Sequence, residues 1–177
     1  MNTEKNWLNQ QQQLICERRS VRHFSDRQPT ENQIDAILEA GRWAPSGLNN
    51  QPWRFAVIRD PELQSKIASL TKYHRVIEEA SVLINVFLDK DMLYHREKDI
   101  QSIGAALQNM LLMTHSLGLG AVWLGEILKN GEQVCKLLEL PPRYELMAVI
   151  ATGYPAEPHK NQEKGRKPLE ELILLRR

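Results

Sequence analysis

The chain has 177 residues, the length of one ordinary domain, and its 42% apolar and 25% charged residues are typical of a globular protein and not of a disordered one. Its 23 Lys and Arg residues nearly balance 22 Asp and Glu residues, so the formal charge of +1 gives no electrostatic footprint for nucleic acid or for an acidic membrane. No segment has the apolar core of a signal peptide or the length of a membrane span. We therefore expect a cytoplasmic protein with no nucleic-acid or membrane partner.

Two helices are predicted in the first part of the chain. Apolar residues at heptad spacing between positions 7 and 15 favour an amphipathic helix that ends near residues 18–20. A second helix begins with a capping box, in which the Thr30 side chain satisfies the amide of Gln33 and the Gln33 side chain reaches back. It ends before Pro45, because the residue ahead of a proline is pushed away from helical angles.

Short apolar segments alternate with helix signals over the rest of the chain. Strands are predicted at residues 54–59, 82–88, 121–124 and 146–151, and helices from Asp60-Pro61, from about residue 99 to 114 and from 132 to 140. Gly118 and Gly120 mark the end of the longest helix. This alternation predicts an α+β fold, in which a mixed central sheet is flanked by helices.

Residues 156–177 form an unusual tail. It is polar and Lys-rich at its start, and it finishes with an apolar group that comprises Leu169, Leu172, Ile173, Leu174 and Leu175. On an isolated monomer these side chains would stay partly wet, and a terminus that is not tied down usually frays. We therefore expect the tail to wrap around a second copy of the chain.

No motif in the sequence indicates a metal site or a catalytic nucleophile. The five His residues are scattered, and no two have the four-residue spacing that places two ligands on one helical face. Cys16 and Cys135 are too few for a disulfide scaffold and form no Cys-x-x-Cys motif. The chain has no Gly-x-Ser-x-Gly elbow. The Gly118-x-Gly120 fragment follows a helix, whereas a dinucleotide-binding fingerprint opens one.

Two basic clusters and one polar loop remain. The clusters lie at residues 18–22 and 164–167, and their guanidinium groups suit bidentate contact with phosphate oxygens. The loop at residues 45–53 carries Ser, Gly, Asn and Gln, whose hydroxyl and amide groups can bind a polar planar ligand. Solvated surface charge and an ordinary turn are the alternatives for these features.

Short motifs in a fixed order run from residue 18 to residue 172. They are Arg18-Arg19-Ser20-Val21-Arg22-His23-Phe24, then Ala44-Pro45-Ser46 through Asn49-Asn50-Gln51-Pro52-Trp53, then Gly118 through Gly125, then Gly153-Tyr154-Pro155 and Lys164-Gly165-Arg166-Lys167-Pro168-Leu169. Together they resemble the FMN-dependent nitroreductase family. The resemblance implies a single FMN-binding domain over residues 1–177, an obligate homodimer with FMN at its interface, and a domain-swapped tail at 156–177.

The resemblance also implies which basic residues hold the cofactor. By position, Arg18 and Ser20 face the phosphate and ribityl chain of FMN, and Arg19 belongs to the same cofactor-binding cluster. Lys164 and Arg166 match the pair that grips the phosphate from the C-terminal segment. Two segments far apart in the chain are thus expected to meet at one phosphate.

Other matched positions concern the flavin ring. Pro45, Ser46 and Asn49 correspond to a loop that the partner chain lays against the ring and ribityl chain. Gly125 and Glu126 correspond to the turn whose backbone approaches the N5 side of the flavin. Arg22 is expected at the pyrimidine edge, where positive charge stabilises the negative charge of reduced flavin.

The implied activity is an NAD(P)H-dependent FMN oxidoreductase with a ping-pong mechanism. NADH or NADPH delivers hydride to N5 of the flavin, and a nitroaromatic, quinone or related acceptor then takes the electrons, so we expect no catalytic side chain. The same fold hosts reductive dehalogenation and flavin fragmentation, which stay as alternatives. Two further alternatives are a flavin-binding protein with little turnover, for storage or sensing, and a helical adaptor without a cofactor.

The connection between Leu88 and the helix near Asp99 is only about ten residues long, which is typical of the compact members of the family. Longer members wall the acceptor pocket with a helical excursion at this place. Candidates for the lining of the pocket here are Tyr73, His74, Tyr94 and His95.

Overall fold

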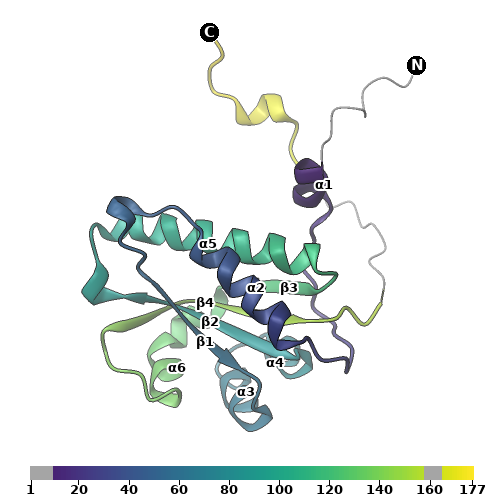
Figure 1. The fold of residues 1–177 in the computed structure, drawn as a ribbon, viewed down its shortest axis with the longest axis vertical. Coiled ribbons are helices and arrows are strands. Elements are labelled where there is room, and N and C mark those ends of the chain that lie inside the picture. Colours follow the sequence, from purple (N-terminus) through teal and green to yellow (C-terminus); the bar gives the residue numbers. More distant parts are fainter. Residues whose placement is uncertain (1–9, 158–164) are drawn as a thin grey trace.

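A four-stranded sheet separates two layers of helices in the computed structural model, which describes residues 10–157 and 165–177 (Figure 1). The strand order is β1 (Trp53–Ile58), β2 (Val82–Asp89), β4 (Tyr144–Gly153) and β3 (Gly120–Leu124). One layer holds α2 (Glu31–Arg42) and α5 (Arg96–Ser116); the other holds α3 (Pro61–Ala68), α4 (His74–Glu79) and α6 (Gly131–Leu137). The helix α1 (Gln10–Glu17) and the C-terminal segment extend away from these layers (Figure 1). No described helix is long and apolar enough to cross a membrane.

The α+β class is confirmed, but the expectation of a mixed sheet needs correction. The pairs β1–β2, β2–β4 and β3–β4 are all antiparallel. Among the described residues, parallel pairing is confined to an isolated bridge between Ser20 and Ala121. Alternation of helices and strands does not set strand direction. Between β1 and β2, for example, α3 and α4 pack against each other and return the chain to the same end of the sheet.

Several helix caps and helix ends that the sequence predicts are present in the structure. Thr30 and Gln33 form the capping box of α2, with the Gln33 amide 3.3 Å from Thr30 Oγ1 and the Thr30 amide 3.0 Å from Gln33 Oε1. Asp60 Oδ1 accepts a hydrogen bond of 2.7 Å from the Leu63 amide at the start of α3. Gly118 adopts a positive φ of 72° directly after α5, a conformation that glycine adopts without steric cost. Helix α4 was not expected, because its six residues are too few for a helical period to show.

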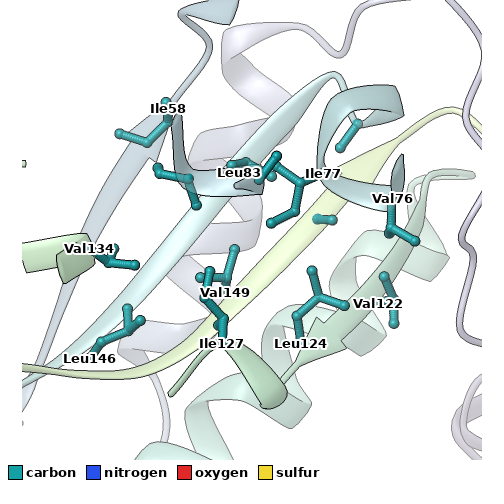
Figure 2. Close-up of a cluster of buried hydrophobic side chains, with 14 of the residues drawn as sticks. Ile58, Val76, Ile77, Leu83, Val122, Leu124, Ile127, Val134, Leu146 and Val149 are labelled. Carbon is teal, nitrogen blue, oxygen red and sulfur yellow. The ribbon is translucent and has the colours of Figure 1, made fainter. Parts of the chain in front are cut away.

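Two apolar cores lie on opposite faces of the sheet. Every residue of β2 is buried, because helices cover both faces of this central strand. One core joins α3, α4 and α6 to the sheet through side chains such as Ile77, Leu83, Ile127 and Val149 (Figure 2). The other joins α2 and α5 to the opposite face. Each fully buried Ile or Leu contributes about 1.5–3 kcal/mol before entropy costs.

Helix α5 sets the spacing between the two ends of the molecule at which the expected cofactor-binding residues lie. Its 21 residues give it a length of about 31 Å. The loop before β1 contacts the first turn of α5, and the segment after α1 contacts β3, which follows the last turn of α5. The α1 boundary at Glu17 agrees with the predicted helix end, while positions 7–9 of that helix lie outside the described residues.

Candidate functional site

The basic segment after α1 is anchored to β3 by a close approach at Gly120. The Val21 amide donates a hydrogen bond of 3.0 Å to the Ala121 carbonyl, and Val21 is buried. A Cβ atom at Gly120 would lie 2.4 Å from Val21 Cγ2, so a side chain there is incompatible with this packing. Ser20 and Arg22, on either side of Val21, are exposed. Both are therefore available to a ligand on a rigidly attached segment.

Arg18 and Arg166, from opposite ends of the chain, are near enough for their charges to interact. Partial burial lowers the pKa of the Arg18 guanidinium, and the nearby charges of Arg166 and Arg19 lower it further. Within residues 10–157 and 165–177, neither Arg18 nor Arg166 forms an ion pair with a carboxylate. Arg19 turns back to the carbonyls of Cys16 and Arg18 at the end of α1. Two like charges without a counter-ion suit a phosphate dianion, which accepts bidentate hydrogen bonds from guanidinium groups. Lys164, predicted for the same phosphate, lies outside the described residues.

The loop before β1 holds a strained conformation. It contains a short 3₁₀ turn (Gly47–Asn49), and three non-glycine residues have positive φ: Leu48 at 52°, Asn49 at 55° and Gln51 at 47°. Ser46 Oγ accepts a hydrogen bond of 3.0 Å from the Gln51 amide, so this predicted flavin contact also closes the loop. Pro45 and Asn49 are exposed.

A buried carboxylate ties this loop to the first turn of α5. Asn50 Nδ2 donates to Asp99 Oδ1 at 2.8 Å, and the amides of Tyr94 and His95 donate to Asp99 Oδ2 at 2.8 and 2.9 Å. Burial by itself raises the pKa of Asp99, but the hydrogen bonds from Asn50, His95 and Tyr94 outweigh it and hold the pKa below its usual value. Tyr94 also packs on Gly47, where a Cβ atom would lie 2.8 Å from its ring. Asn50 and Asp99 carry no sequence signal of this contact, because they are far apart along the chain.

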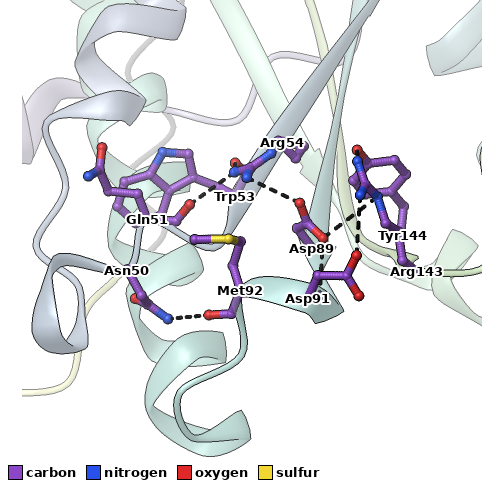
Figure 3. Close-up of polar contacts among 9 residues, drawn as sticks. All are labelled: Asn50, Gln51, Trp53, Arg54, Asp89, Asp91, Met92, Arg143 and Tyr144. Carbon is purple, nitrogen blue, oxygen red and sulfur yellow. Dashed lines mark hydrogen bonds and ion pairs between the residues drawn. The ribbon is translucent and has the colours of Figure 1, made fainter.

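A second set of polar contacts lies at the same end of the sheet (Figure 3). Arg54 Nη1 donates to the Gln51 carbonyl at 3.0 Å, and Arg54 Nη2 lies 3.1 Å from Asp89 Oδ2. The Asp89 amide donates to the Pro52 carbonyl at 2.8 Å, and Arg143 Nε lies 3.9 Å from Asp89 Oδ1. Asp89 is buried, so its charge is compensated by two arginines at the base of the loop.

In the predicted turn after β3, the backbone is exposed at Gly125, whereas the Glu126 side chain contacts other residues of the protein. Glu126 forms an ion pair with Lys129 and accepts hydrogen bonds from Thr71 Oγ1 at 2.6 Å and from the Lys72 amide at 3.3 Å. The Lys129 contact, followed by the Thr71 contact, lowers the pKa of Glu126 to about 2. A Cβ atom at Gly125 would meet no described atom within 4 Å, so the backbone there is open to a ligand.

One chain does not assemble all of the predicted site. Arg18, Ser20 and Arg166 are grouped near β3, whereas Ser46 and Asn49 lie beside the first turn of α5. The length of α5, about 31 Å, separates the two groups. The candidate pocket-lining residues Tyr94 and Tyr73 also lie in different surroundings, since Tyr94 packs on Gly47 of the loop and Tyr73 lies beside Thr71, which contacts Glu126. The described residues also contain no cluster of side chains that could hold a metal ion.

Known proteins are similar to this chain in sequence and in fold. A family model described as the nitroreductase family matches residues 15–74 and 68–154. A solved structure of a Desulfovibrio desulfuricans protein, described as a nitroreductase in complex with FMN, is 46% identical and has a TM-score of 0.90, covering 96% of this chain and 98% of that chain. A Methanothermobacter thermautotrophicus protein, named NADH dehydrogenase/NAD(P)H nitroreductase, is 37% identical over 147 residues, or 82% of this chain and 77% of the relative. Iodotyrosine deiodinase of Thermotoga neapolitana is 28% identical over 186 residues, or 91% of this chain and 94% of the relative.

Proposed function

The chain belongs to the nitroreductase family, and from this membership we propose that it is an FMN-dependent oxidoreductase. It takes electrons from NADH or NADPH and passes them to a small acceptor such as a nitroaromatic or a quinone. The observation that carries the proposal is the fold, shared with a protein that is 46% identical and was solved with FMN; the charge of Arg166 acting on Arg18, with no carboxylate paired to either among the described residues, supports it.

The chain's own residues bind and orient the cofactor. Arg18 and Arg166 would hold the phosphate, and Ser20 would contact the ribityl chain beside them. Arg22, which is exposed, would place positive charge at the pyrimidine edge, and the open backbone at Gly125 would face the ring. FMN itself supplies the two-electron redox chemistry. Glu126 supports the turn through Thr71 and Lys129 and is not needed as an acid or base.

The complete site requires a homodimer. A two-fold axis across the middle of α5 would bring the first turn of one copy's helix near the last turn of the other's, and so join the loop to the basic cluster. The outer face of α5 is suited to such an approach, because a Cβ atom at Gly104 would meet no described atom within 4 Å. The tail supports the same assembly, since Leu169, Leu172, Leu174 and Leu175 are each at least 61% exposed.

Reductive dehalogenation is the second candidate function. It is favoured by the match to iodotyrosine deiodinase of Thermotoga neapolitana, which extends over 91% of this chain. The two candidates share the flavin and differ in the acceptor. A halogenated phenol and a nitroaromatic of similar size, offered to the reduced protein under anaerobic conditions, therefore separate them.

The absorbance spectrum of the purified protein is the first test. We expect a yellow protein whose flavin band is bleached by NADH or NADPH without oxygen and restored by a quinone or a nitroaromatic. A yellow protein that is not bleached at a useful rate would instead support a storage or sensing role. A colourless protein that takes up no added FMN would overturn the proposal and favour the adaptor alternative.

A further inference from the structure

The loop before β1 has a conformation that it could not keep by itself. Leu48, Asn49 and Gln51 all have φ near +50°, a region that non-glycine residues rarely occupy. Backbone of this kind persists where surrounding contacts hold it, and it is concentrated at binding sites. The contacts that hold this loop are therefore candidates for a functional role.

Asn50 is the first anchor, and it lies between two of the three strained residues. Its Nδ2 atom donates to Asp99 Oδ1 and to the Met92 carbonyl, each at 2.8 Å. Both partners are acceptors, so the orientation of the amide group is determined. Asn50 Oδ1 is buried without a hydrogen-bond donor among the described residues, a cost that the two Nδ2 hydrogen bonds offset.

Arg54 is the second anchor and acts at the end of the loop. It joins the Gln51 carbonyl to the buried carboxylate of Asp89 (Figure 3). The two anchors use different carboxylates, Asp89 at the end of β2 and Asp99 in α5. Loss of the Asn50 contact therefore frees the middle of the loop and leaves its attachment to β1 in place.

We propose that Asp99, acting through Asn50, is a positioning residue that determines how tightly the protein binds FMN. The inference rests on the proposed function, in which the homodimer joins this loop to the basic cluster, and on the expectation from the sequence that Asn49 contacts the flavin. A loop that is already held in its binding conformation loses little entropy when the ligand binds. Without the Asn50–Asp99 hydrogen bond, the free energy of ordering Leu48 and Asn49 would be subtracted from the binding free energy of FMN.

The test is Asn50→Ala, measured by titration of the apoprotein with FMN. We expect the Kd for FMN to rise by about tenfold, the effect of losing one hydrogen bond to a charged group. The matched control is Asn109→Ala, which removes another asparagine contact of α5, a 3.2 Å hydrogen bond to the Ala40 carbonyl. The control should lower the unfolding temperature without changing the Kd. The visible circular dichroism of bound flavin, recorded at saturating FMN, should change for Asn50→Ala alone.

A double-mutant cycle gives the inference a second, independent test. Asp99→Asn breaks the same contact from the other side, because its amide nitrogen would face Asn50 Nδ2. Asn50→Ala and Asp99→Asn should each raise the Kd, and the double variant should be no weaker than the weaker single variant. Suppose that the wild type binds FMN. The positioning role is then wrong, and the proposed function stands, if Asn50→Ala has the wild-type Kd and circular dichroism. The same conclusion follows if the effects of Asn50→Ala and Asp99→Asn on the Kd are additive. A wild type without affinity for FMN would overturn both.

Discussion

The positive charges of Arg18 and Arg166 act on one another, although Arg18 follows the first helix and Arg166 belongs to the C-terminal segment. Partial burial of Arg18 and repulsion from Arg166 both lower the pKa of Arg18. Like charges held in this way destabilise the free protein slightly and are stabilised by an anion. This difference between the free and bound states is the physical basis of the first prediction.

Arg18→Ala and Arg166→Ala should each weaken FMN binding by about 1.5–3 kcal/mol, the scale of a charge-assisted hydrogen bond. Neither substitution should lower the unfolding temperature of the apoprotein, because neither arginine forms an ion pair within the part of the chain that the structure describes. Titration with FMN and thermal unfolding measure the two effects separately. Lys66→Ala is the charge-matched control, since Lys66 lies on α3 in the other helix layer and pairs with Glu62 at 2.6 Å. Wild-type affinity in both arginine variants would contradict the phosphate assignment.

Arg22→Ala should lower the midpoint potential of the bound flavin. It should weaken the binding of reduced FMN more than the binding of oxidised FMN. Arg22 is exposed, and its guanidinium donates a long hydrogen bond of 3.4 Å to the Ser20 carbonyl, so we expect the alanine variant to fold. Each kcal/mol of lost stabilisation of reduced flavin corresponds to roughly 20 mV for a two-electron couple. Spectroelectrochemical titration measures the shift, and Arg22→Lys, which keeps the charge, should retain most of the wild-type potential. An unchanged potential in the alanine variant would exclude a role at the pyrimidine edge.

Truncation after Pro168 should weaken the dimer and flavin binding together. The truncated chain keeps Arg166 and loses the exposed apolar side chains of the tail, so any loss of flavin reports assembly and not a missing phosphate ligand. Burial of these side chains against a second copy would contribute about 1.5–3 kcal/mol for each one that is fully buried. Analytical ultracentrifugation over a concentration series gives the dissociation constant. A flavin-loaded wild-type monomer at micromolar concentration would rule out the obligate dimer.

Gly120→Ala should destabilise the protein by about 1–3 kcal/mol, the usual cost of overpacking. The added Cβ atom would lie 2.4 Å from Val21 Cγ2, and displacement of Val21 moves Ser20 and Arg22 with it. We therefore expect weaker FMN binding as well as a lower denaturant midpoint. Adding Val21→Ala to this variant makes room for the new methyl group, so the combined loss of stability should be smaller than the sum of the single losses. Strict additivity would show that the close contact is not the cause.

Glu126→Gln should reduce stability at pH 7 but not near pH 2. The folded protein lowers the pKa of Glu126 from 4.5 to about 2 through Lys129, Thr71 and Lys72. A depressed pKa contributes stability above the unfolded value, and this contribution is lost as the pH falls from about 4.5 to about 2. Denaturant unfolding at several pH values should show the wild type and the variant converging in acid. Glu132→Gln, on an exposed glutamate of α6 without an ion pair among the described residues, is the control for the loss of one negative charge.

Elements that depend on neighbouring residues were predictable from the sequence. The capping box of Thr30 and Gln33, the N-cap at Asp60 and the helix end at Gly118 each involve residues within a few positions of one another. The direction of the strands was not predictable in this way. It depends on how α3 and α4 pack, which local periodicity does not encode, and so the mixed sheet was wrong.

The sequence by itself determined the family, the order of helices and strands and the two basic clusters, because motifs and periodicity are properties of short segments. Only the tertiary structure decided that Asp99 holds Asn50, that Thr71 and Lys129 hold Glu126, and that the charge of Arg166 acts on Arg18. It also decided that the loop and the basic cluster lie at opposite ends of α5. These relationships join residues far apart along the chain, and their distances follow from the path of the backbone through space, which no local pattern specifies.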